Sequence, residues 1–183
     1  MKPAPLNADP EARAALREAM DALDLAQASG LAWAVAEAHL GLARNYRQLG
    51  ETGFALALLQ QGLAAAQGAD QRVELLCQCV GTLAEQAEQL EAGRPSARNA
   101  ASSAARDAAR EHIAEASRLA ARVADPHWEV KVLLHLSDVL DRFGDHGDAV
   151  QLQTRAMRLL QRPGSGSAAD PLPLASLGRL ADA

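Results

Sequence analysis

The residues best suited to chemistry gather in the stretch RFGDHGDAV, which spans positions 142–150. Asp145, His146 and Asp148 stand there around two glycines, and carboxylates and imidazoles are common metal ligands in proteins. A metal loop is therefore the first hypothesis. However, the upstream stretch QLGETGFAL at 48–56 keeps both glycines and the first acidic residue while replacing His146 and Asp148. Because the backbone pattern recurs without the ligands, we expect a turn between two helices and no metal.

Other reactive side chains do not form a recognisable site either. Cys77 and Cys79 are the two cysteines, and neighbours two apart on a helix point to different sides, so we expect two buried thiols. The five histidines include no i, i+4 pair, and no nucleotide-binding or nucleophile motif occurs. We therefore expect no catalytic residue, no cofactor and no enzymatic activity.

Composition and charge limit the class of protein. Of the 183 residues 49% are hydrophobic but only 3% aromatic, with alanine prominent, which favours closely packed helices over sheets. The formal net charge of -5 argues against nucleic-acid binding. No apolar stretch reaches the length of a signal peptide core or a membrane span. We expect an all-α protein of the cytoplasm without membrane contact.

An internal repeat organises the chain. Gly50 and Gly144 lie 94 positions apart, and this shift places Leu42 on Leu136 and also aligns other small and apolar residues. Around each glycine, apolar residues recur every three or four positions and form stripes that we expect to face the core, with Trp33 in the first copy and Met157 in the last. This pattern predicts a helical hairpin with a first helix A and a second helix B. About seven antiparallel helices result, because a helix near the N-terminus takes the place of a helix B without its partner.

The expected divisions are a flexible N-terminus at 1–9, a helical array at 10–162, and a linker with a short helix at 163–183. Within the array we expect the extra helix at 10–28 and repeats at 31–67, 70–124 and 126–162. The middle repeat contains an insertion at 91–108, rich in alanine and serine. Either it extends the second helix of that repeat, or it forms a flexible loop.

The first repeat carries a distinctive pattern around its turn glycine, in Leu42, Ala43, Tyr46, Gly50, Ala55 and Gly62. By this pattern the repeats resemble the tetratricopeptide repeat (TPR) family, in particular the arrays of bacterial signalling proteins, over about Glu11 to Gln161. The last repeat matches it with two substitutions, in Leu136, Ser137, Leu140, Gly144, Ala149 and Ala156. The middle repeat matches it weakly, in Leu83, Ala84, Ala87, Ala109 and Ala116. The resemblance implies a right-handed superhelix of antiparallel hairpins.

The resemblance also implies protein binding, in a concave groove lined by the A helices. The matching groove positions are Glu37, Leu40, Arg44, Arg47, Gln48, Gln78, Glu85, Glu88, Gln89, Lys131, Leu134, Asp138, Asp141 and Arg142. They form a polar surface of mixed sign. The lysines and asparagine of the carboxylate-clamp pattern are absent, which disfavours binding to a chaperone tail.

The resulting hypothesis is a non-catalytic module that binds a peptide or helix of a protein partner in this groove. The first alternative is a regulatory module of a bacterial signalling system, associated with a diguanylate cyclase or a transcription regulator. Such a module would form a homo-oligomer through the ends of its array or its extended middle helix. The second alternative is a small-molecule-binding protein or an enzyme with an unrecognised site.

Overall fold

The computed structural model of the chain describes residues 10–92 and 95–161. These residues form seven helices and no strand, which confirms the all-α prediction and the number of helices. The helices are α1 (Pro10–Ser29), α2 (Ala32–Gln48), α3 (Thr52–Ala65), α4 (Ala69–Glu91), α5 (Pro95–Ala120), α6 (Pro126–Phe143) and α7 (His146–Leu160). The flexible N-terminus expected at 1–9 and the linker and short helix expected at 163–183 lie outside the described residues.

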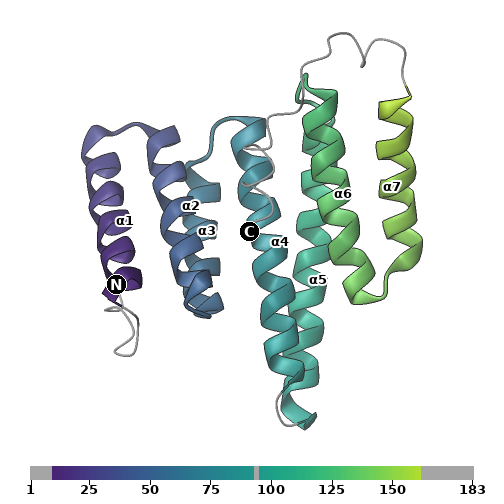
Figure 1. Ribbon diagram of the computed structural model, residues 1–183, viewed down its shortest axis with the longest axis horizontal. Helices are drawn as coiled ribbons and strands as arrows, with labels where there is room; N and C mark the ends of the chain where they lie inside the picture. The colour runs from purple at the N-terminus through teal and green to yellow at the C-terminus, as the bar shows by residue number, and fades with distance from the viewer. Residues whose placement is uncertain (1–9, 93–94, 162–183) are drawn as a thin grey trace.

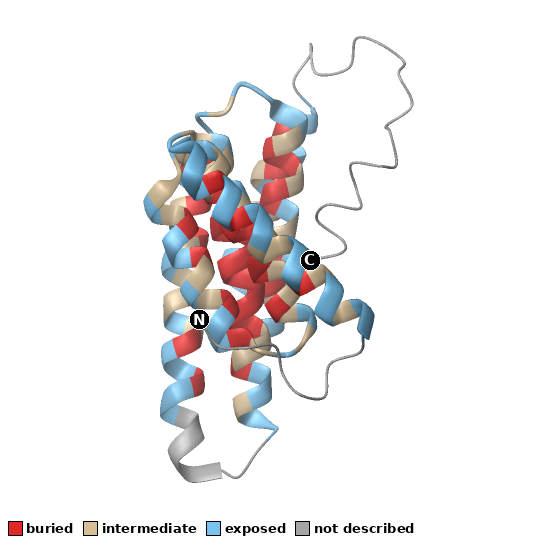
Figure 2. Ribbon diagram, turned by 90° about the vertical axis from the view of Figure 1, so that its left-hand side faces the viewer, coloured by how far each residue is buried: buried red, intermediate tan, exposed pale blue. Residues whose placement is uncertain are grey.

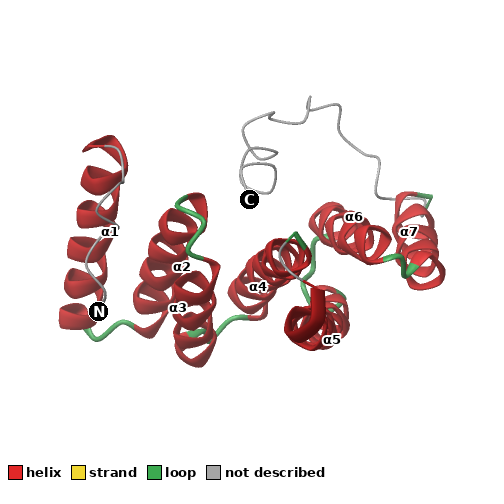
Figure 3. Cartoon of the chain, turned by 90° about the horizontal axis from the view of Figure 1, so that it is seen from below, coloured by secondary structure: helices red, strands yellow, loops and turns green. Residues whose placement is uncertain are grey.

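The helices stand side by side in a row that begins with α1 and ends with α7 (Figure 1). Consecutive helices run antiparallel, and α2 with α3, α4 with α5, and α6 with α7 form the three hairpins. Seen along the helix axes, α2, α4 and α6 follow one side of the row, which we call the A face (Figure 3). The helices α3 and α5 lie on the opposite side.

The two repeated turns have the same backbone structure. Gly50 and Gly144 have φ angles of 73° and 82°, a left-handed conformation that only glycine adopts at little cost. The N–H groups of Gly50 and Glu51 donate to carbonyls three and five residues back, at 2.8 and 3.0 Å. Those of Gly144 and Asp145 do the same at 3.0 and 2.9 Å, the pattern of a Schellman helix end. The spacing of 94 residues thus corresponds to a repeated backbone feature.

The insertion at 91–108 extends the middle hairpin. Helix α4 continues to Glu91 and α5 already begins at Pro95, so the extended helix, and not the flexible loop, is the alternative that the structure shows. Both helices consequently project beyond their neighbours at one end of the row (Figure 1).

The core continues along the row and is densest around α4, where every residue from Leu75 to Ala84 is buried (Figure 2). Helix α4 contributes both to the cluster shared with α1, α2 and α3 and to the cluster shared with α5 and α6. Trp33 and Met157, which the sequence pattern placed on inward stripes, are instead more than half exposed. Both lie on helix flanks that no described helix covers. Within the described ranges, no helix is long and apolar enough to cross a membrane.

Candidate functional site

The predicted groove residues lie on α2, α4 and α6, and most of them are exposed or half-buried on these helices. The exposed ones are Glu37, Gln48, Glu88, Gln89, Leu134, Asp138 and Arg142, and the half-buried ones are Arg44, Arg47, Glu85, Lys131 and Asp141. Gln78 is almost fully buried. Leu40 is fully buried in the core between α1, α2 and α3, so its assignment as a groove residue is wrong.

Arg47 connects α2 to α4 at the centre of the A face. Its Nε and Nη2 atoms donate to the Glu85 carboxylate at 2.7 to 3.0 Å, and its Nη1 atom donates to Gln78 Oε1 at 3.0 Å. A Cβ atom at Gly81 would stand 3.5 Å from the guanidinium, so any side chain longer than alanine would displace it. The Arg47 side chain is therefore held inside the protein, and only 14% of its surface is exposed.

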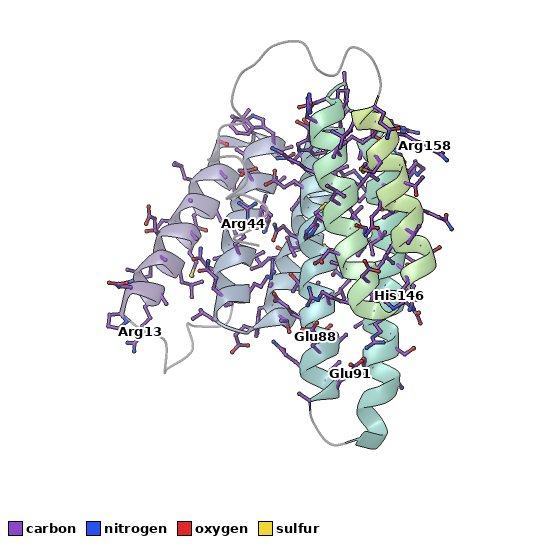
Figure 4. The ribbon with its side chains drawn as sticks, turned by 45° about the vertical axis from the view of Figure 1, so that its right-hand side comes forward. Arg13, Arg44, Glu88, Glu91, His146 and Arg158 are labelled. Carbon is purple, nitrogen blue, oxygen red and sulfur yellow. The ribbon has the colours of Figure 1, made fainter. Side chains whose placement is uncertain are left out.

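Two further ion pairs continue this connection along the A face. Arg44 of α2 contacts Glu74 of α4 at 2.8 Å, and Arg142 of α6 contacts Glu88 of α4 at 2.6 Å. The labelled side chains of Arg44 and Glu88 lie on neighbouring helices of the row in Figure 4. Five of the predicted partner-binding charges thus pair with charges of the chain itself: Arg44, Arg47, Glu85, Glu88 and Arg142.

The side chains around Asp145 make contacts within the chain. The Asp145 carboxylate accepts hydrogen bonds from Arg110 of α5 at 2.7 and 3.2 Å. His146 Nδ1 lies 3.0 Å from an oxygen of Asp141, and Asp148 is exposed. The described residues contain no group of three or more histidine, cysteine or acidic side chains that could hold a metal ion. Asp145 instead fastens the α6–α7 turn to α5.

Burial favours the uncharged forms of the two cysteines and of two histidines, His39 and His135. Burial raises the pKa of the Cys77 and Cys79 thiols to about 12, so neither is a thiolate nucleophile in the folded chain. Burial lowers the pKa of His39 and of His135, and a hydrogen bond to the Cys77 backbone opposes the shift at His135. His39 Nδ1 has no hydrogen-bond partner among the described residues, and none of the described pockets includes His39.

A small polar pocket of about 300 Å³ lies on the projecting middle hairpin, lined by Glu91, Ser102, Ser103, Arg106 and Arg110. Glu91 accepts hydrogen bonds from Ser102 and Arg106, and the Arg106 guanidinium lies 5.5 Å from the centre of the Phe143 ring. Glu91 pairs with Arg106, and Arg110 pairs with Asp107 and Asp145 outside the pocket. Both arginines are thus already paired within the chain, which does not favour an ionic ligand.

An apolar groove of about 570 Å³ lies between α1 and α2, and we call it the N-terminal groove. Its lining consists of Ala19, Ala22, Leu25, Ala26, Ser29, Leu31, Trp33, Ala34, Glu37, Ala38 and Gly41. Leu25, Leu31 and Trp33 are each at least half exposed, an unusual concentration of large apolar side chains in contact with water. Among the predicted site residues only Glu37 belongs to this groove.

The repeat architecture explains why this groove is open. Each of α3, α5 and α7 packs against the A helix that precedes it in its hairpin. Gly62 of α3, for example, faces Ala36 and His39 of α2. Helix α1 packs against α2 as α3 packs against α4, but no described helix forms a hairpin with it. Among the described helices, none therefore covers its alanine-rich flank or the adjoining flank of α2. The sequence analysis predicted a helix B without its partner, which is the feature that leaves this groove open. It did not predict that Leu25 and Leu31 would be exposed there.

No protein family model matches the chain, and no curated protein matches it.

Proposed function

We propose that this chain is a non-catalytic interaction module of the TPR type, a right-handed superhelix that binds a helical segment of a protein partner along its A face. The partner's apolar residues would occupy the N-terminal groove. The single observation that carries the proposal is this open apolar groove with Leu25, Leu31 and Trp33 at its surface. The identical backbone turns at Gly50 and Gly144 support the repeat assignment.

The groove is suited to a helix for a geometric reason. It occupies the position at which a further A helix would pack against α1 and α2, as α2 packs against α3 and α4. Small side chains such as Ala22, Ala38 and Gly41 allow the axis of an incoming helix to approach closely. Apolar side chains spaced three or four residues apart on that helix would then contact Trp33 and Leu25.

The polar residues of the A face have a different role in this proposal. Arg44, Arg47 and Arg142 already form ion pairs inside the chain, so they fix the spacing of α2, α4 and α6. Glu37 lines the groove itself and is available to orient a partner that carries a basic residue beside its apolar ones. Action in the cytoplasm and participation in signalling stay predictions from the sequence.

A groove-filling substitution tests the proposal. Gly41 has open space around its Cβ position, so Gly41→Leu would fill the groove without adding charge, and Gly53→Leu on α3 makes the same change at another open position. Immobilised wild-type protein and both variants are incubated with lysate of the source organism, and the retained proteins are identified by mass spectrometry. We expect at least one partner to be retained by the wild type and Gly53→Leu but lost with Gly41→Leu. Equal retention by all three proteins would refute binding in this groove.

A further inference from the structure

Seven of the eight large exposed hydrophobic side chains of the described residues lie towards the two ends of the row. Three of them, Leu25, Leu31 and Trp33, surround the N-terminal groove. Four others lie on the last hairpin: Leu134, Val150, Met157 and Leu160. The eighth, Phe54, stacks on Tyr46 with 5.7 Å between ring centres. The two apolar surfaces are at opposite ends of the molecule, with α1 at one end and α7 at the other (Figure 1).

Helix α7 has two apolar flanks, of which only one is used inside the chain. Ala149, Ala156 and Leu159 are buried, and the last two join the α6–α7 cluster. Val150 and Met157 lie seven residues apart, and therefore on one flank after about two helical turns. Both are more than half exposed. An amphipathic helix normally presents polar residues on its outer flank, so this second apolar flank requires its own explanation.

The charges at the two ends are complementary. Helix α1 carries four acidic residues against two arginines, and Glu37 adds a carboxylate inside the groove. Helix α7 carries two arginines against one aspartate. Arg155 pairs with Glu129 of α6, whereas Arg158 projects outward from α7 (Figure 4). Arg158 thus places a positive charge on the same terminal helix that exposes the apolar residues Val150 and Met157.

We propose that the occupant of the N-terminal groove is a second copy of this chain, whose α7 docks there through Val150, Met157 and Leu160. This inference rests on the proposed function of the groove as a helix-binding site. Arg158 of one copy then lies near the acidic α1 and Glu37 of the next. A symmetric contact between two N-terminal grooves is disfavoured, because it would bring the acidic residues of two α1 helices together. The contact joins different surfaces, so copies add head to tail in an open chain.

Two blocking variants test this arrangement. Gly41→Leu fills the groove and leaves α7 intact, whereas Met157→Glu places a charge on the exposed flank of α7 and leaves the groove intact. Each variant alone should sediment as a monomer over a concentration series in which the wild type and the Gly53→Leu control associate. We expect the dissociation constant to rise about tenfold or more in each. Circular dichroism verifies that both variants are folded.

Mixing the two variants gives the decisive result. The intact α7 of Gly41→Leu can enter the intact groove of Met157→Glu, and the blocked ends prevent further growth. The mixture should therefore form a one-to-one dimer and nothing larger. Self-association of Met157→Glu alone, with a monomeric Gly41→Leu, would overturn the head-to-tail contact in favour of paired grooves. A mixture that stays monomeric, or a wild type that is monomeric throughout, would also overturn it.

The same measurements separate this inference from the proposed function. If the wild type is monomeric but Gly41→Leu still loses a partner from lysate, self-association fails and the groove keeps its proposed function. If Gly41→Leu changes neither self-association nor partner retention, both proposals fail. In a Trp128→Phe background, which leaves Trp33 as the only tryptophan, docking should shift the fluorescence emission to shorter wavelength as the protein concentration rises.

Discussion

Removing the Arg47 guanidinium and the Glu85 carboxylate, singly and together, is expected to reveal a coupling free energy of about 1–2 kcal/mol in the stability of the fold. Hydrogen bonds that involve charged groups contribute about 1.5–3 kcal/mol when protected from water, and exposed ion pairs about 0.2–1 kcal/mol. The Arg47 and Glu85 side chains are 14% and 33% exposed, so solvent screening reduces the larger value. Three hydrogen bonds between the two groups keep the coupling above that of an exposed pair.

The neighbouring pairs provide a graded comparison. Arg44 and Glu74 are 30% and 31% exposed, and Arg142 and Glu88 are 39% and 56% exposed. We expect coupling free energies of about 0.5–1 kcal/mol for the first pair and about 0–0.5 kcal/mol for the second. The order of the three values should follow the burial of the pairs, because screening by water weakens the more exposed ones.

Urea unfolding of each alanine single and double variant, followed by circular dichroism, gives the three cycles. Repeating the series in high salt should reduce the two exposed couplings more than that of Arg47 with Glu85. A coupling near zero for Arg47 with Glu85, or the reverse order among the pairs, would refute the view that these charges connect the A helices. They would then be available for a partner, as the sequence alone suggested.

Three further predictions concern the turns, the thiols and pH. Gly144→Ala should destabilise the fold by about 1–2 kcal/mol because the φ angle of Gly144 is left-handed. Gly41→Ala should stabilise it by about 0.5–1 kcal/mol, because Gly41 lies inside a helix with open space at its Cβ position. Urea unfolding measures both free energies, and equal effects would contradict the turn structure. Cys77 and Cys79 should react with a thiol reagent only at the rate of unfolding, as followed by absorbance, since both are buried and protonated. The pKa of His135 is lowered in the fold, so as pH falls through about 6.5 the unfolded chain binds a proton before the folded chain does. The unfolding free energy should therefore decrease in this range. In His135→Gln this dependence on pH should be weaker.

Much of the architecture could be read from local patterns. The period of three to four residues predicted helices, and Gly50 and Gly144 predicted turns, because both features depend on interactions within a few residues of the chain. The burial of Cys77 and Cys79 followed from residue type and position. The insertion was ambiguous because alanine and serine do not decide between helix and loop. Packing of α4 against α5 supplies the contacts that accompany the helical form.

The candidate site was less predictable, because a residue's availability depends on what packs against it. Leu40 has the sequence position of a groove residue, yet the neighbouring helices enclose it completely. The charge of Arg47 is visible in the sequence, but its pairing with Glu85 joins residues 38 positions apart. Trp33 was expected to be buried because it continues an apolar stripe, and it is exposed because α1 has no hairpin partner among the described helices.

The sequence by itself thus determined that the chain is helical and where its turns lie, and it predicted a first helix without a hairpin partner. These properties are recorded in the local order of apolar residues and glycines. The tertiary structure decided which charges neutralise one another and which apolar side chains remain exposed. Both outcomes depend on the distances between separate helices, and these distances are set only when the whole array packs.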